Sequence, residues 1–320
     1  MDIQESREVP GIPIIYQDHY LLVVNKPAGL VVHPTYKHTD GTMWDAVLDI
    51  LAQQGSDGWQ PAELPDRPGW ERAPSHVREM LREQQRLKYI REEGLLPRPC
   101  LLHRLDKDTS GIVALARTER ARRHLSHQFQ DHTIVKRYLA VVGRGAPGWA
   151  SSRGLLKVSR MIDEEQSVEA SADMLWTVDS EITIEGPLQR DQDDRRRCIV
   201  GLQGQRAITQ VRTLAANDAY AMLEVRPVTG RTHQIRAHLA AAGYAIVGDK
   251  TYGMPPGEGG PEVALSRQFL HAHSLELRRY HDNALCNFVA PLAVDLAAWL
   301  GKYFPAGMEA LDARRSISDG

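Results

Sequence analysis

Short apolar runs separated by turn residues recur along the whole chain, a pattern that predicts many short strands. The runs that predict strands are residues 14–16, 21–24, 111–118, 135–142, 182–184, 198–202, 207–214, 219–227, 244–253 (with a loop), 269–277 and 284–291. The clearest hairpin is expected between 207–214 and 219–227, across an Ala-Asn-Asp turn. Residues 147–180 are polar and predict no clear element.

Apolar positions repeated every three or four residues predict a few helices between these strands. A helix is expected over 75–93, with Ser75 as its N-cap and Gly94 closing it. Thr118 is expected to cap a second helix, whose apolar stripe is Ala121, Leu125 and Phe129. Two later helices are expected, one between a Thr232 cap and Gly243 and one over 295–300. Many hairpin-like strands with few helices predict an α+β fold instead of a regular βαβ alternation.

Composition narrows the class of protein. The 320 residues are 42% hydrophobic and 25% charged, as in soluble globular proteins. No apolar run has the length needed to cross a bilayer, and the polar N-terminus predicts no signal peptide. The three cysteines lie far apart without a CxxC pair, which favours a reducing compartment, here the cytoplasm, and argues against a structural zinc site.

The charge is nearly balanced overall but uneven along the chain. A net charge of −2 and a pI near 6.7 do not by themselves indicate a nucleic-acid binder. Residues 101–144, however, carry nine Lys and Arg against four Asp and Glu. A local basic surface on a neutral protein is therefore expected, although a solvated face is the commoner meaning of such a run.

Three segments combine bulky polar residues with buried strands or a helix start: HRLDKDTSG (103–111), KRY (136–138) and TGRTHQIR (229–236). Arg231 stands just before a predicted helix, whose free N–H groups and dipole favour an anion. Asp106 taken alone predicts an ordinary turn cap bonded to nearby amides. His271 and His273 share one strand face, but no third metal ligand is near in sequence, so ordinary core or surface histidines are expected.

HRLDKDTSG resembles the H-R-L-D-x-x-T-S-G signature of the RluA family of pseudouridine synthases, with a match at every fixed position. KRY is similar to the second motif of that family, and TGRTHQIRAHLAAAGYAIVGDKTYG is similar to the third. The segments IIYQDHYLLVVNKPAGLVVHP and GQRAITQVRTL are also similar to members of the family. The resemblance spans about residues 12–300, and the order of its motifs makes it specific.

The resemblance implies the α+β pseudouridine synthase fold, a mixed and largely antiparallel central sheet flanked by helices, with an active-site cleft across the sheet. It implies a single catalytic domain over 12–305, between a short N-terminal tail (1–11) and a C-terminal tail (306–320). The N-terminal S4-like domain of many relatives is not expected. Two insertions are expected, a helical segment at 55–98 and a polar segment at 147–180.

The implied reaction is the isomerisation of uridine to pseudouridine in ribosomal or transfer RNA. The C–N glycosidic bond breaks, the uracil turns, and its C5 rejoins the ribose. No electrons or groups enter from outside, so neither a cofactor nor a metal is expected. RNA is the expected partner, and we expect no membrane association, no obligate protein partner and a monomer.

The resemblance also assigns catalytic roles to Asp106, Tyr138 and Arg231. Asp106 would attack the anomeric carbon or remove a ribose proton, and the sequence does not choose between them. Arg231 would pair with Asp106 and keep it ionised in a water-poor pocket. Tyr138 would stack on the uracil and serve as the base at C5.

The expected substrate-binding residues are His103, Arg104, Lys136 and Arg137. Arg104 would occupy the gap that the extruded uridine leaves in its stack. Lys136 and Arg137 would meet phosphates, while His103 would contribute an orienting hydrogen bond.

Two other functions compete with this assignment. An RNA-binding assembly or folding factor could use the same cleft without catalysis, but binding alone needs no reactive carboxylate. Glycoside hydrolysis generally uses two carboxylates, and only Asp106 is evident. The insertion at 55–99 and the acidic stretch at 160–194 are the expected determinants of RNA preference because they adjoin the motifs in sequence.

Overall fold

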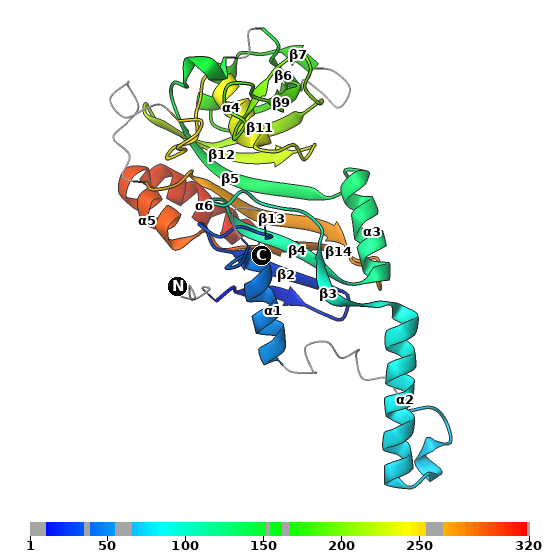
Figure 1. Cartoon of the computed structure of the whole chain (residues 1–320). Coiled ribbons are helices and arrows are strands. Elements are labelled where there is room, and N and C mark those ends of the chain that lie inside the picture. The colour runs from blue at the N-terminus through cyan, green and yellow to red at the C-terminus, as the bar shows by residue number, and fades with distance from the viewer. Residues whose placement is uncertain are drawn as a thin grey trace, which may run out of the picture. The chain divides into compact units, whose positions relative to one another are not determined.

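The computed structural model describes residues 11–34, 39–54, 66–151, 154–161, 167–253 and 265–318 (Figure 1). Its contacts divide the chain into two compact units. Unit 1 comprises residues 1–107, 112–134 and 276–288, and unit 2 comprises residues 108–111, 135–275 and 289–320. The HRLDKDTSG segment therefore passes from unit 1 into unit 2 and back. The single catalytic domain expected over 12–305 stays a prediction.

Unit 1 is built on short strands and three helices. Its strands are β1 (Ile14–Gln17), β2 (Leu21–Lys26), β3 (Leu95–Leu101), most of β4 (Ser110–Thr118) and most of β14 (Leu285–Val289). Its helices are α1 (Met43–Gln53), α2 (Ser75–Glu93) and α3 (Glu119–Gln130), with a 3-10 turn, η2 (Trp70–Arg72). The hydrogen-bonded order is β1-β2-β4, and β3 pairs with β4 in antiparallel fashion.

Unit 2 contains a longer run of neighbouring strands in the order β13-β5-β12-β11-β8-β6-β7. These are β5 (Val135–Gly143), β6 (Lys157–Met161), β7 (Ser167–Glu169), β8 (Glu181–Glu185), β11 (Ile208–Ala216), β12 (Tyr220–Pro227) and most of β13 (Leu270–Arg278). A separate antiparallel ribbon is formed by β9 (Leu188–Arg190) and β10 (Cys198–Val200). The helical elements are η3 (Gly148–Ala150), η4 (Ala172–Trp176), α4 (Gln234–Ala241), α5 (Val294–Tyr303) and α6 (Pro305–Ser318).

Antiparallel pairing predominates, and one parallel pairing joins the start of β4 to β13. The predicted α+β class, with a mixed and mostly antiparallel sheet flanked by helices, is confirmed. The predicted hairpin is formed by β11 and β12, with Thr209 opposite Pro227 at its open end. Within the described segments, no helix is both long and apolar enough to span a bilayer.

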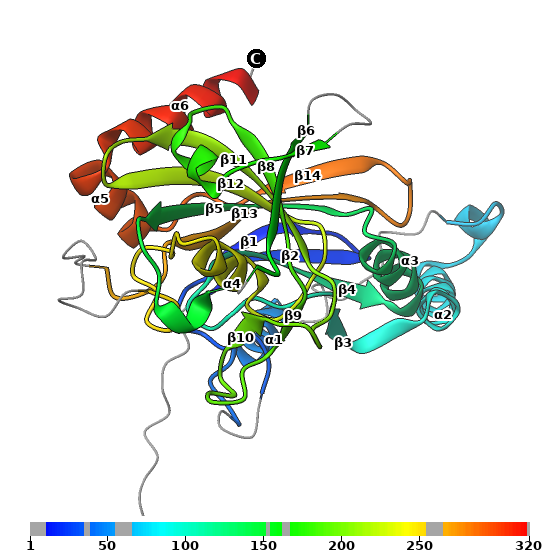
Figure 2. The same ribbon diagram turned by 90° about the horizontal axis from the view of Figure 1, so that it is seen from above.

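The core of unit 2 lies on β5, β12 and the helices that pack on them. Leu139, Ala140, Val141 and Val142 are all buried, so the second half of β5 is covered on both faces. Figure 2 shows α5 and α6 beside β11 and β12, and Trp299 and Phe304 belong to this core. The first half of β5, by contrast, is only half-buried, and that is where Tyr138 lies.

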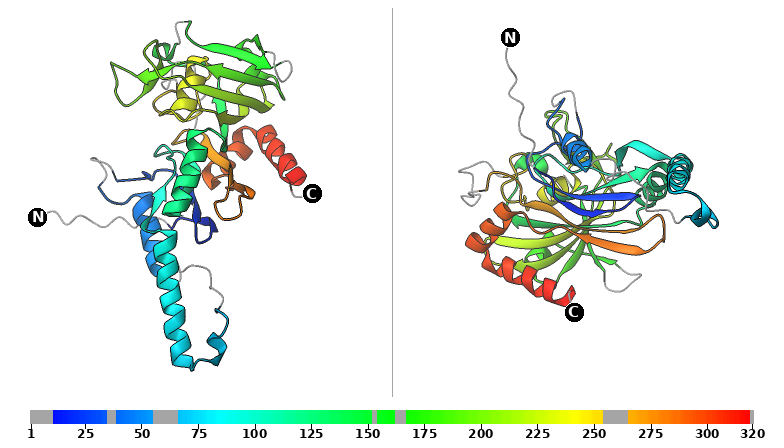
Figure 3. Two further views of the ribbon diagram at one scale, coloured as in Figure 1. Left: turned by 90° about the vertical axis from the view of Figure 1, so that its right-hand side faces the viewer. Right: turned by 90° about the horizontal axis from the view of Figure 1, so that it is seen from below.

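Helix α2 lies in the insertion expected at 55–98, and its own unit leaves most of it uncovered, as Figure 3 shows. It begins at Ser75, and the Pro74 carbonyl accepts hydrogen bonds from Val77 and Arg78, both at 3.0 Å. Pro74 is therefore the N-cap, and the prediction that Ser75 caps the helix is wrong by one position. Gly94 follows the helix with φ +67°, as expected for a helix end.

The other predicted caps had mixed outcomes. Thr118 caps α3 as predicted, because its hydroxyl accepts a hydrogen bond from the Ala121 amide at 3.2 Å. Thr232 does not cap α4, whose N-cap is His233. The Arg231 amide donates to the Gln234 Oε1 at 3.0 Å, which holds the turn before the helix, whereas the His233 side chain makes no capping hydrogen bond.

Three regions differ from or add to the expected elements. The strand predicted over 244–253 is not formed. In this described segment, Tyr244 and Ile246 make only isolated β-bridges, with Gly145 and Val142. The tail expected at 306–320 contains α6 up to Ser318, and the polar segment at 147–180 contains η3, β6, β7 and η4. The tail expected at 1–11 lies outside the described residues, Gly11 excepted.

Candidate active site

The HRLDKDTSG segment connects β3 to β4 and carries Asp106 in a loop. His103 at its start accepts a hydrogen bond from the Ala114 amide on Nε2 at 3.1 Å, and its ring stacks on Phe129 at 5.2 Å. Leu105 is buried, Arg104 is exposed and Asp106 is half-buried. The orienting hydrogen bond expected of His103 is confirmed, whereas contact of His103 with a substrate stays a prediction.

A buried lysine in unit 1 binds the backbone next to Asp106. The Lys26 side chain is fully buried, and its Nζ donates to the carbonyls of Pro27 (2.8 Å), Leu30 (2.9 Å) and Lys107 (2.9 Å). Because a buried ammonium is costly unless it is hydrogen-bonded, these three carbonyls define its position. Lys26 thus ties the residue that follows Asp106 to the turn after β2. Nothing in the local sequence predicts this contact, because Lys26 and Lys107 lie 81 positions apart.

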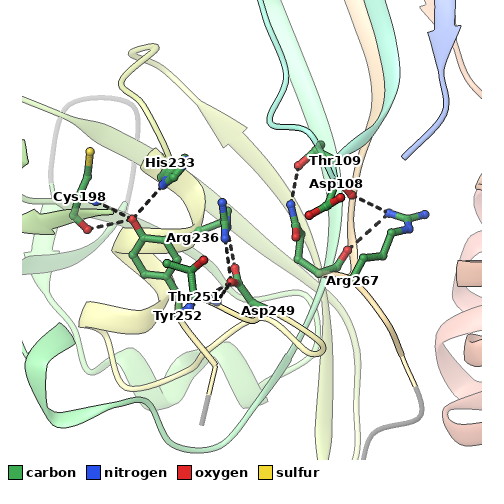
Figure 4. A network of polar contacts seen from close by, with 10 residues as sticks. Asp108, Thr109, Cys198, His233, Arg236, Asp249, Thr251, Tyr252 and Arg267 are labelled. Carbon is green, nitrogen blue, oxygen red and sulfur yellow. Dashed lines mark hydrogen bonds and ion pairs between the residues drawn. The ribbon is translucent and has the colours of Figure 1, made fainter. Parts of the chain in front are cut away.

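In unit 2, one short segment contacts the four residues that complete the motif, and Figure 4 shows its contacts on Asp108 and Thr109. Arg267 donates to the Asp108 carbonyl (3.2 Å) and, through Nη2, to Ser110 Oγ (3.3 Å). Gln268 Nε2 donates to Thr109 Oγ1 (3.2 Å), and Ala272 pairs with Gly111. A Cβ on Gly111 would lie 2.2 Å from the Ala272 carbonyl oxygen, so only glycine fits there. These contacts give Thr109 and Gly111 a structural role in shaping the loop.

The KRY motif lies on the half-buried end of β5. Tyr138 stands opposite Val225 of β12, and Lys136 and Arg137 precede it on the same strand. Burial lowers the pKa of the Lys136 ammonium. Its Nζ would lie 3.9 Å from a Cβ placed on Gly230, so the structure brings Lys136 close to the backbone that carries Arg231.

Arg231 is exposed and lies in the turn before α4. Its Nε donates to the Arg206 carbonyl at 3.2 Å, and its amide is held by Gln234. Between them, His233 has a left-handed backbone with φ 55° and ψ 20°, an uncommon conformation for a non-glycine residue. Arg231 is therefore held at its backbone amide and at its Nε.

The start of the third motif also contacts residues near the end of the same motif, as Figure 4 shows. Arg236 on α4 forms a buried bidentate pair with Asp249, at 2.6 and 2.8 Å. Asp249 Oδ1 in turn accepts from the Tyr252 amide at 3.0 Å, and His233 Nδ1 lies 3.2 Å from the Tyr252 hydroxyl. Asp249 and Tyr252 of the GDKTY segment thus hold Arg236 and His233, which follow Arg231 in the chain.

The predicted residues are therefore placed in two groups. Unit 2 brings the Lys136 ammonium close to Gly230, which precedes Arg231, and it holds residues 108–111 of the loop. Asp106 belongs to unit 1 and Arg231 to unit 2, so their pairing stays a prediction, as do the catalytic roles of both and of Tyr138.

The fold defines the class of protein. Two solved structures share it: "Human RNA Pseudouridylate Synthase Domain Containing 4" and "Human RNA Pseudouridylate Synthase Domain Containing 1" both superpose with a TM-score of 0.52. Their sequences are 21% and 22% identical to this chain, covering 90% and 91% of it and 92% and 88% of their own length. The architecture is that of pseudouridylate synthase domains.

Sequence comparison then shows the family. The profile described as RNA pseudouridylate synthase matches residues 20–241, which include all three motifs through TGRTHQIR. The chain belongs to this family, as the motifs predicted, and is an isomerase of the pseudouridine synthase class.

Curated relatives extend the match over most of the chain. "Ribosomal large subunit pseudouridine synthase D" of Nitrosomonas europaea is 29% identical over 92% of this chain and 67% of its own length. The protein of the same name in Xylella fastidiosa is 31% identical over 93% of this chain and 72% of its own length. An "Uncharacterized RNA pseudouridine synthase" of Chloroflexus aurantiacus is 34% identical, over 85% and 63%. The chain spans about two thirds of the length of these relatives.

Proposed function

We propose that this chain isomerises uridine to pseudouridine in ribosomal RNA, with Asp106 as the reacting carboxylate. The observation that carries the proposal is the HRLDKDTSG loop. The residues after Asp106 in this loop are held by the buried side chains of Lys26 and Arg267. Ribosomal RNA is favoured over transfer RNA because relatives from three organisms bear the name of a large-subunit ribosomal enzyme.

The local structure suits a carboxylate that reacts with a nucleoside. Leu105 is buried while Asp106 is half-buried, so the side chain of Asp106 is not enclosed in the apolar core of unit 1. The backbone immediately after Asp106 is fixed at Lys107 and Asp108 by cationic side chains. A fixed backbone allows the carboxylate to meet the anomeric carbon or a ribose proton without reorganisation.

The remaining assignments divide the work between unit 2 residues. Arg231 would balance the charge of Asp106 at the start of α4. Tyr138, on the half-buried end of β5, would stack on the uracil and remove the C5 proton. Lys136 and Arg137 would bind phosphates beside the extruded nucleotide, and Arg104 would fill the space that it leaves. We infer that the chain acts as a monomer in the cytoplasm.

The decisive experiment measures pseudouridine formation on transcribed ribosomal and transfer RNA by the wild type and by Asp106→Asn. We expect Asp106→Asn to lower product formation by at least about a thousandfold while RNA binding is kept. Asp108→Asn is the matched control, because Asp108 contacts Arg267 through its backbone carbonyl, which asparagine also has. Near-normal turnover by Asp106→Asn would remove Asp106 from its role.

The same assay separates the alternatives for the whole chain. RNA binding without any product from the wild type would favour the assembly or folding factor. Product on transfer RNA alone would overturn the choice of ribosomal RNA and leave the reaction in place. Mapping pseudouridines in cellular RNA with and without the protein then identifies the modified positions.

A further inference from the structure

Arg267 is a buried cation whose hydrogen bonds are all accounted for. Its side chain is 6% exposed, and Asp295 accepts from Nε at 2.7 Å and from Nη2 at 2.8 Å. The other Nη2 hydrogen reaches Ser110 Oγ at 3.3 Å, and Nη1 donates to the carbonyls of Asp108 (3.2 Å) and Gln268 (3.5 Å). A guanidinium has five N–H donors, and these contacts use five.

Asp295 sets the orientation of this guanidinium from α5. Burial would raise the pKa of the Asp295 carboxyl, but the hydrogen bonds and charge of Arg267 bring that pKa below its ordinary value. The bidentate geometry leaves Arg267 no freedom to rotate about its long axis. Its remaining N–H groups therefore point at the loop in one arrangement.

Ser110, which Arg267 contacts, is also hydrogen-bonded to His271. Burial and the neighbouring His273 lower the pKa of His271 to about 4, so its ring is neutral near pH 7. His271 Nε2 faces the Ala290 carbonyl at 3.4 Å, and a carbonyl only accepts, so Nε2 carries the proton. His271 Nδ1 therefore accepts from the Ser110 hydroxyl at 2.9 Å, which leaves Ser110 Oγ to accept from Arg267.

We infer that Arg267 and the Ser110–His271 pair are positioning residues for the reaction proposed above, because they fix the backbone that follows Asp106. Asp108 and Ser110 lie two and four residues after Asp106, and Arg267 contacts both. Displacement of a reacting group by about 1 Å costs on the order of a hundredfold in rate. This inference rests on the proposed function and extends it to Arg267, 159 positions after Asp108, and to His271, 161 positions after Ser110.

The test compares Arg267→Lys with Arg197→Lys in steady-state turnover of the RNA substrate. Arg267→Lys keeps the charge but has three donors in place of five. Asp295 takes two hydrogen bonds and Ser110 and Asp108 take one each, so three donors cannot serve them all. We expect its kcat to fall by about 10- to 100-fold with KM changed less than about threefold. Arg197 is the matched control: it pairs with Asp191 at 2.5 Å, is 16% exposed, and lies in the same unit. Its variant should keep kcat within about twofold of the wild type.

Hydrogen exchange provides a readout that does not depend on activity. Amides of residues 106–110 should exchange faster in Arg267→Lys and in Ser110→Ala than in the wild type, at matched melting temperature. Unchanged exchange there, or a kcat equal to that of the wild type, would overturn the inference even if the wild type is active. A wild type without activity, combined with faster exchange in the variants, would instead count against the proposed function. Equal losses of kcat in Arg267→Lys and Arg197→Lys would show only a general structural effect and would also overturn the inference.

Discussion

Buried polar side chains are concentrated along the loop that carries Asp106. Lys26, Ser110 and His271 are each at most 1% exposed, and Thr109 is 2% exposed. Each has a hydrogen-bond partner, as buried polar groups require. Such groups add little net stability but tolerate few alternative geometries, because an unpaired group would cost the full desolvation penalty. At the scale of single residues, the loop is specified by polar contacts more than by apolar packing.

The neutral state of His271 predicts a pH dependence of stability. Its pKa is about 4 in the folded chain, against 6.5 for the free side chain, because burial disfavours the charged ring. The unfolded chain therefore binds more protons between these values, so the stabilisation is complete above pH 6.5 and is lost as the pH falls towards 4. The free energy of unfolding should fall by about 2–3 kcal/mol from this residue between pH 7 and pH 4.5.

Urea unfolding of the wild type and of His271→Gln at both pH values measures this contribution. The variant should lose less stability than the wild type over the same interval, whatever its stability at pH 7. An equal loss in both proteins would show that folding does not lower the pKa of His271.

At the scale of elements, the C-terminal helices complete the core of unit 2. Helix α6 packs on β11 and α5, with Leu311 6% exposed in the core. Arg314 adds an ion pair to Glu224 of β12 at 3.0 Å. The sequence predicted only a tail here, since α6 carries a weak apolar pattern and depends on the partners that it covers.

Leu311→Ala should therefore lower the free energy of unfolding by about 2–4 kcal/mol, because it leaves a cavity in this core. Val294→Ala on the neighbouring helix α5 is the control, since Val294 is 85% exposed and should change stability by less than about 0.5 kcal/mol. Urea denaturation of the two variants gives both values. Equal stability of the two variants would mean that Leu311 of α6 is not packed in the core of unit 2 in solution.

At the scale of the whole molecule, a net charge of −2 gives little general attraction to RNA. We therefore expect RNA binding to depend on local basic residues such as Lys136 and Arg137 on β5. The arginines of α2 contribute less than their number suggests, because Arg82 pairs with Asp66 at 2.6 Å and Arg86 with Glu83 at 3.2 Å. The repeated Arg78, Arg82 and Arg86 are thus a partly neutralised helix face.

RNA affinity should fall linearly in a plot of log K against log salt concentration, because phosphate contacts release counterions. Arg137→Gln should reduce the magnitude of that slope by about 0.7, the value for one phosphate contact in single-stranded RNA. Arg314→Gln, which removes a cation paired with Glu224, should leave the slope unchanged. Filter binding between low and moderate salt measures all three proteins, and identical slopes would exclude Arg137 from phosphate binding.

Local patterns determined much of this protein. Most strands, the Thr118 cap, the β11–β12 hairpin and the three motifs are each encoded within a few neighbouring residues, so the sequence alone predicted them and the family. Strands β3, β6, β7 and β9 were not predicted. Helix α1 was missed although its signal is local: the Thr42 and Asp45 capping box is present, followed by buried Ala46, Val47 and Leu51.

Tertiary structure alone decided what holds the Asp106 loop. Lys26 lies 81 positions before the Lys107 carbonyl that it binds, and Arg267 lies 159 positions after Asp108. Periodicity and propensity describe residues that are neighbours along the chain, whereas hydrogen bonds across such separations exist only after the strands have paired. The packing of α6 on β11 follows the same rule. Local residue types select the elements, and only burial in the folded chain selects which polar groups meet.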